Sequence, residues 1–149
     1  MTSDEFRILH STVIEHYQYI EHHLEGIYAA LCGKPFIMGL EDVEKSNIIQ
    51  LIQEIKKIEE ERQISVLSDS DFERLQHIRI RRNFWSHNCY VDMVFDRRTD
   101  APKKDIDIKS LIEDINEARM IRDILFEKKQ IYMSRYNRQH KVDYKIENR

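Results

Sequence analysis

Apolar residues recur at steps of three and four positions along four long stretches of this chain. That spacing places apolar side chains on one face of an α-helix. It predicts helices over about residues 3–31, 42–61, 69–95 and 106–132. Gly33 and Pro35 end the first helix, and residues 36–40 form a short apolar connection to the second.

The other connections are short and polar, and no internal repeat or linker divides the chain. Four long helices joined in this way favour an all-α fold, an antiparallel four-helix bundle. We expect residues 1–149 to form one domain, with residues 36–40 as the additional short connection. The chain turns polar after the fourth helix, and residues 135–149 are interpreted as a polar C-terminal tail that can extend the helix, fray or be mobile.

Composition supports helices over sheets. Of 149 residues, 41% are hydrophobic and 34% charged, with only three Gly and two Pro. Cys32 and Cys89 have no paired spacing and are interpreted as free thiols of a reducing compartment. The first ten residues carry acids where a signal peptide would carry bases, and no apolar run approaches 18 residues. These features predict a cytoplasmic protein without a membrane partner. The net charge of −3 argues against a protein that coats duplexes non-specifically.

The segment Arg82-Asn83-Phe84-Trp85-Ser86-His87 is the strongest candidate site. An arginine guanidinium is permanently charged and matches phosphate oxygens, whereas histidine exchanges a proton near neutral pH. The carboxamide of Asn83 can donate to a phosphate or orient either neighbour. Arg79 and Arg81 lie just before the motif and are candidates for RNA contact.

At this motif the sequence resembles the HEPN superfamily of small all-α domains. Its ribonuclease members are recognised by an arginine, four to six further residues and a histidine, often with a polar residue after the arginine. Arg82, Asn83 and His87 match that pattern. HEPN toxins paired with minimal nucleotidyltransferase antitoxins also have a tyrosine two residues after the histidine. This chain has Cys89 there and Tyr90 one residue later, which argues against regulation by nucleotidyl transfer to that tyrosine.

The motif predicts cleavage of RNA without metal or other cofactor. RNA supplies its own nucleophile, the 2′-hydroxyl, so the enzyme has only to move protons and stabilise charge. His87 is the candidate proton donor and acceptor. Arg82 is the candidate for stabilising charge on the phosphate. The resemblance implies products with a 2′,3′-cyclic phosphate and a 5′-hydroxyl, and a role as a toxin or defence effector with a possible antitoxin or other regulatory protein.

Helix geometry adds a constraint on this site. Each residue advances a helix by about 100°, so five positions separate Arg82 from His87 by about 140°. Asn83 and His87, four positions apart, share a face. A distorted helix or a wrapped arginine would bring Arg82 and His87 together, and so would a two-fold homodimer that pools both copies. The resemblance implies the dimer, since HEPN ribonucleases typically form their site across one.

Other interpretations remain open. Phe84 and Trp85 suit core or dimer packing better than base stacking. His16 and His23 can share a face beside His22, but the sequence has no matching ligand set for a metal. The chain can also be a non-catalytic HEPN-like module that binds a nucleotide or a protein. In a third interpretation it is a structural helical subunit.

Overall fold

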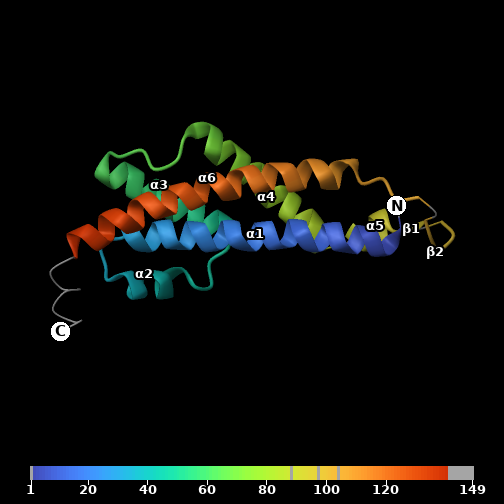
Figure 1. Ribbon diagram of the computed structural model, residues 1–149, viewed down its shortest axis with the longest axis horizontal. Helices are drawn as coiled ribbons and strands as arrows, with labels where there is room; N and C mark the ends of the chain where they lie inside the picture. Colours follow the sequence, from blue (N-terminus) through green and yellow to red (C-terminus); the bar gives the residue numbers. More distant parts are fainter. Residues whose placement is uncertain (1, 88, 97, 104, 141–149) are drawn as a thin grey trace. The chain divides into compact units, whose positions relative to one another are not determined.

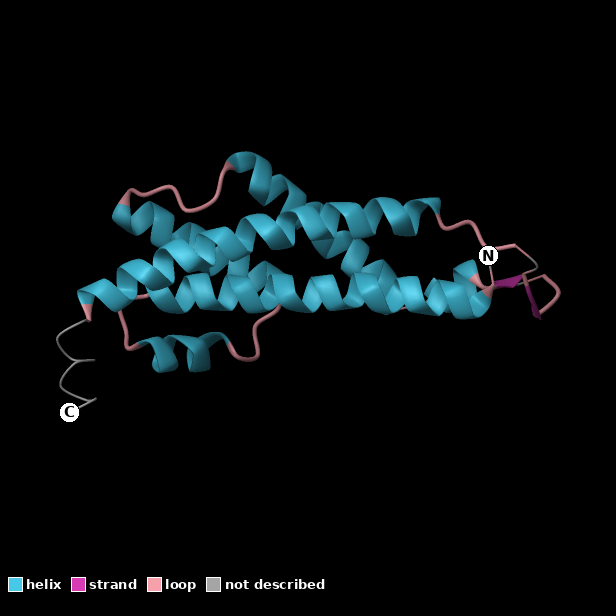
Figure 2. Cartoon of the chain, viewed as in Figure 1, coloured by secondary structure: helices cyan, strands magenta, loops and turns pink. Residues whose placement is uncertain are grey.

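The computed structural model describes residues 2–87, 89–96, 98–103 and 105–140. Within these residues the protein is mostly helical, as the sequence predicted (Figure 1 and Figure 2). The helices are α1 (Ser3–Leu31), α2 (Phe36–Val43), α3 (Ile48–Arg62), α4 (Asp69–Ser86), α5 (Cys89–Met93) and α6 (Lys109–Gln139). Two short antiparallel strands separate α5 from α6: β1 (Phe95–Asp96) and β2 (Ala101–Pro102).

The chain divides into two compact units. Unit 1 comprises residues 1–20 and 69–122, and unit 2 comprises residues 21–68 and 123–149. Helices α1 and α6 each contribute to both units, whereas α4 and α5 belong to unit 1, and α2 and α3 to unit 2. Each unit therefore combines a segment of α1 and a segment of α6 with two helices of its own.

In unit 1, α4 runs antiparallel to α6. His77 of α4 contacts Glu117 of α6, and Arg81, one turn later in α4, contacts Asp114, one turn earlier in α6. The interior of this unit is built from the inward rows of α1, α4 and α6. Its buried apolar residues include Phe6, Val13, Tyr17, Ile20, Phe72, Leu75, Ile78, Trp85, Leu111, Ile115, Ala118 and Ile121.

In unit 2, α1 and α6 run in the same direction. His23 contacts Phe126 and, one turn later on both helices, Gly26 approaches Lys129. This pair departs from a strictly antiparallel bundle. The buried apolar residues of unit 2 include Leu24, Ile27, Leu31, Val43, Ile48, Leu51, Ile52, Ile55, Ile58, Leu125 and Tyr132.

Residues 36–40, predicted as a connection, are helical and begin α2. The second helix expected over residues 42–61 is therefore divided, because α3 has its own start at Asn47. The Asn47 side chain accepts a hydrogen bond from the Gln50 backbone N–H, and the Gln50 side chain accepts one from the Asn47 N–H. This capping box satisfies backbone donors at the start of α3.

Helix α6 is longer than the sequence indicated, ending at Gln139 rather than near residue 132. Tyr136 accounts for the extension: its ring packs against Phe36, and its hydroxyl accepts a hydrogen bond from the Phe36 backbone N–H at 2.9 Å. Residues 135–139 of the expected tail are thus helical, and residues 141–149 lie outside the described residues. No helix in the described part of the chain is long and apolar enough to cross a membrane.

Two helical glycines provide a test of packing in unit 2. A Cβ added at Gly39 would lie 2.9 Å from the Ala29 Cα and 2.8 Å from the Cys32 Sγ, so backbone would have to move. We expect Gly39→Ala to lower the free energy of unfolding by about 1–3 kcal/mol in urea denaturation.

Gly26→Ala is the matched control. Its Cβ would meet only the flexible side chain of Lys129, at 2.7 Å from Cδ, and alanine favours a helix interior by about 1 kcal/mol over glycine. We expect stability to be unchanged or raised. Equal losses in the two variants would contradict the close approach of α2 to α1.

Candidate functional site at the end of α4

A buried carboxylate, that of Asp114, holds α4 against α6. Its Oδ2 atom accepts two hydrogen bonds at 2.7 Å, one from the Arg81 Nε–H and one from the Trp85 Nε1–H. Asp114 and Trp85 are buried, whereas Arg81 is partly exposed. Charge-assisted hydrogen bonds of this kind are stronger than neutral ones. The two hydrogen bonds fix the rotation of α4 about its axis over its last two turns.

The Asp114 charge also acts on Tyr17, which is buried in the same unit. Burial raises the pKa of the Tyr17 hydroxyl well above its usual value, and the nearby Asp114 carboxylate adds to the increase. Tyr17 is therefore neutral throughout the physiological range. Asp114 supplies the negative charge at this point, and Arg81 balances it.

His10 of α1 anchors the last turn of α4. Its Nε2 atom lies 2.7 Å from the carbonyl oxygen of Trp85, so Nε2–H is the donor. In the neutral ring Nδ1 is then an acceptor, and it lies 3.1 Å from the Tyr90 hydroxyl. The Cys89 Sγ–H also donates to the Trp85 carbonyl, at 3.3 Å. The Trp85 carbonyl, which would accept a backbone N–H if the helix continued, is thus hydrogen-bonded by the side chains of His10 and Cys89.

This anchoring explains why the helix expected over residues 69–95 ends at Ser86. The Cys89 backbone N–H donates to the His87 carbonyl instead of to the Trp85 carbonyl four residues back. The chain then continues as the separate helix α5. Val91, which lies in α5, is 46% exposed.

The motif residues lie at the solvent-exposed end of α4. Asn83 and His87 are exposed, and Arg82 is partly buried. The His87 N–H donates to the Asn83 carbonyl at 3.2 Å, so helical geometry continues as far as His87. Asn83 and His87 therefore share a face, and Arg82 stays about 140° from His87 around the helix.

The two arginines predicted to contact RNA lie in different surroundings. Arg81 bonds Asp114 and stacks over the Phe84 ring at 4.7 Å, so part of its guanidinium faces the interior. Arg79 is partly buried, and its Nε atom has no hydrogen-bond partner among the described residues. Trp85 is a core residue, as the sequence indicated, and Cys89 is also buried.

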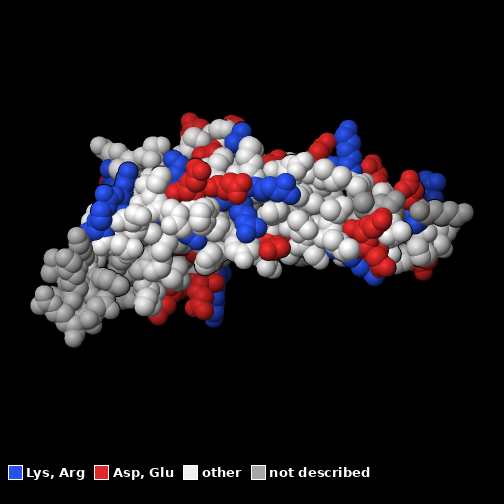
Figure 3. All heavy atoms as spheres, in the orientation of Figure 1, with Lys and Arg blue, Asp and Glu red and all other residues white. Residues whose placement is uncertain are grey.

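The histidines near the start of the chain pack rather than cluster. His16 is buried and its Nδ1 accepts from Arg122 at 3.1 Å, while His23 packs on Phe126. In the part of the chain that the structure describes, no group of three or more His, Cys, Asp or Glu residues is placed to hold a metal ion. On the face shown in Figure 3, acidic and basic side chains are interspersed.

Sequence reasoning missed Asp114 and His10. His10 lies on the row Phe6, His10, Val13 and Tyr17, whose apolar members are all buried. Ile8, two positions before His10, is 68% exposed and lies off this row. Asp114 interrupts the apolar row of α6 three residues after Leu111. A polar residue within a buried row is the available signal, because such a residue requires a partner.

Comparison with family models, curated proteins and solved structures found no match to this sequence.

Asp114→Asn tests the anchor. The amide keeps one acceptor but loses the charge that balances Arg81, so we expect the free energy of unfolding to fall by about 1–3 kcal/mol. Trp85 is the only tryptophan, so its emission should shift to longer wavelength as its surroundings loosen. The exposed neighbour provides the control: Glu113→Gln should change stability by less than about 0.5 kcal/mol. Equal effects would contradict a specific role for Asp114.

The two cysteines should differ in reactivity. Burial raises the pKa of the Cys89 thiol, so its thiolate fraction at pH 8 is below that of an ordinary cysteine. In a Cys32→Ser variant we expect alkylation of Cys89 by iodoacetamide to be slow at pH 8 and to accelerate as pH rises. Unfolding in urea should abolish the protection. Fast labelling of the folded protein at pH 8 would show that Cys89 is not buried.

Proposed function

We propose that this protein is a metal-independent endoribonuclease of HEPN type, with Arg82, Asn83 and His87 as catalytic residues. The observation that carries the proposal is the exposed position of Asn83 and His87 on one face at the end of an anchored helix. A rigid helix end supports catalysis because reacting groups must be held in position. The resemblance in the motif supplies the reaction class.

In this mechanism His87 accepts the proton of the RNA 2′-hydroxyl, or donates one to the departing 5′-oxygen. Either transfer fits a histidine that RNA can reach from solvent. Arg82 stabilises the charge that develops on the phosphate, and Asn83 orients His87 or the phosphate. In a homodimer, each of the two sites would pair the Arg82 of one copy with the His87 of the other.

The proposed biological setting follows from the same resemblance. The protein would act in the cytoplasm as a toxin or defence effector, held in check by an antitoxin or other regulatory protein. Its fold would be a HEPN-like four-helix arrangement with α2 as the additional element. Arg79 and the outer donors of Arg81 would contact RNA phosphates near the cut, a local interaction compatible with a net charge of −3.

The purified protein should cleave single-stranded RNA in EDTA and leave DNA of the same sequence intact, since DNA lacks the 2′-hydroxyl. We expect His87→Ala to reduce cleavage by about 10²–10⁴-fold. We expect Arg82→Ala to cost about 3–4 kcal/mol of transition-state stabilisation. Asn83→Ala should have a smaller effect, because its amide is neutral. The assay is gel analysis of a labelled RNA, with the cyclic phosphate detected by mass spectrometry.

His77→Ala is the matched control, because His77 is an exposed histidine of α4 whose ring bonds Glu117. It should cleave at the wild-type rate. Full activity of a folded His87→Ala variant would show that the motif has a structural role and not a catalytic one. Binding of a nucleotide or protein without cleavage would then support the alternative of a non-catalytic HEPN-like module.

Ile80 provides a test of the dimer. It is 56% exposed on α4 and precedes Asn83 and His87 by three and seven positions, so it shares their face. We expect sedimentation to give a dimer for the wild type and a monomer for Ile80→Glu, with cleavage lost together. The control Ile131→Glu alters an exposed isoleucine of unit 2 and should remain dimeric. A wild-type monomer at tens of micromolar that still cleaves RNA would rule out a shared site.

A further inference from the structure

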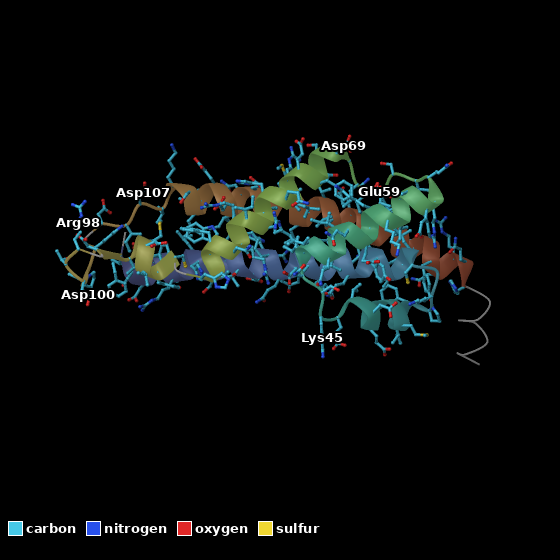
Figure 4. The ribbon with its side chains drawn as sticks, turned by 180° about the vertical axis from the view of Figure 1, so that it is seen from behind. Lys45, Glu59, Asp69, Arg98, Asp100 and Asp107 are labelled. Carbon is cyan, nitrogen blue, oxygen red and sulfur yellow. The ribbon has the colours of Figure 1, made fainter. Side chains whose placement is uncertain are left out.

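Unit 2 contains a hollow of about 470 Å³ between α1, α2 and α3. Its volume lies within the range of about 300–1,000 Å³ that small-molecule sites occupy. The polar residues that line it are Tyr28, Asp42, Ser46, Gln50, Gln53 and Glu54. Lys45, in the turn between α2 and α3, is exposed and extends away from the ribbon (Figure 4).

Tyr28 is the buried wall of this hollow. Its side chain is only 9% exposed, yet its hydroxyl has no hydrogen-bond partner among the described residues. The hydroxyl is also not one of the fully enclosed polar atoms, so it reaches the surface of the hollow. A phenol whose ring is buried and whose polar end is unmatched usually faces water or a ligand.

The lining carries an unbalanced negative charge. The Asp42 carboxylate is balanced by Lys34, which approaches it to 2.6 Å. Glu54 is partly buried and forms no ion pair within the described ranges. The pKa of Tyr28 is raised by burial and further by the nearby groups Cys32, Asp42 and Glu54, which together outweigh the lowering effect of Lys34.

Acidic surroundings extend along α1 from this wall. The pKa of Glu25 is raised by burial and by the negative charges of Glu21 and Glu44. A negative potential of this kind attracts cations and repels phosphate groups.

We infer that this hollow binds a small organic cation with an ammonium or guanidinium group. Glu54 would neutralise the charge, while the Tyr28 hydroxyl and the Gln53 carboxamide would accept N–H hydrogen bonds. The donor set suits an organic cation better than a metal ion, because only Asp42 and Glu54 in the lining are carboxylates and Asp42 is occupied by Lys34. This inference does not depend on the ribonuclease proposal.

The cation can be a free metabolite or the side chain of an arginine or lysine in a peptide, since the recognised group is the same. Isothermal titration calorimetry on the full chain with agmatine and with a capped arginine tetrapeptide separates the two sources. We expect saturable binding of agmatine that weakens as salt is added. Tighter binding of the peptide would assign the hollow to a protein partner. Butane-1,4-diol, MgCl₂ and inorganic phosphate should not bind.

Substitutions locate the binding. Glu54→Gln removes a charged acceptor and should weaken agmatine binding by about 10–100-fold, and Tyr28→Phe, which removes one neutral acceptor, by about 2–10-fold. Glu60→Gln is the control, because it makes the same change on α3 about 240° from Glu54. It should leave binding unchanged.

Three results would overturn the inference. The first is no saturable binding at 10 mM agmatine, a concentration about ten-fold above a Kd of 1 mM. The others are equal losses in Glu54→Gln and Glu60→Gln, or a wild-type affinity in both Glu54→Gln and Tyr28→Phe. Circular dichroism of each variant confirms that it is folded. Because RNA cleavage is assayed separately, loss of cation binding with intact cleavage, or the reverse, distinguishes this inference from the proposed function.

Discussion

The position of the candidate site depends on one interaction, the two hydrogen bonds that the buried Asp114 carboxylate accepts from Arg81 and Trp85. Leaving either donor without its partner inside a protein costs more than a typical hydrogen bond contributes. The rotation of α4 about its axis is therefore set at the turn before the motif. With Arg81 and Trp85 directed to α6, Asn83 and His87 fall on the exposed side.

His10 sets where α4 ends. By occupying the Trp85 carbonyl it takes an acceptor that a continuing helix would need, and Tyr90 and Cys89 complete its surroundings from α5. The motif histidine consequently lies one residue beyond α4.

The sequence predicted the helical class, the inward rows and the burial of Trp85 well, because periodic burial dominates long amphipathic helices. It did not predict the break at Ser86, since no Gly or Pro marks it and its cause is the contact of Trp85 with His10, 75 positions before Trp85. It predicted one helix over residues 42–61, although Asn47 and Gln50 have the spacing of a capping box. Asp114 was missed because hydrogen-bond partners across helices cannot be read from one segment.

The central claim is that Arg82 and His87, about 140° apart on one helix, form a site only when two copies meet. The most direct test is to mix the inactive Arg82→Ala and His87→Ala variants, refold them together and measure RNA cleavage. Random pairing makes half of the dimers mixed, and each mixed dimer regains one of two sites, so about a quarter of wild-type cleavage should return. No recovery, with both variants folded and exchanging subunits, would contradict the shared site.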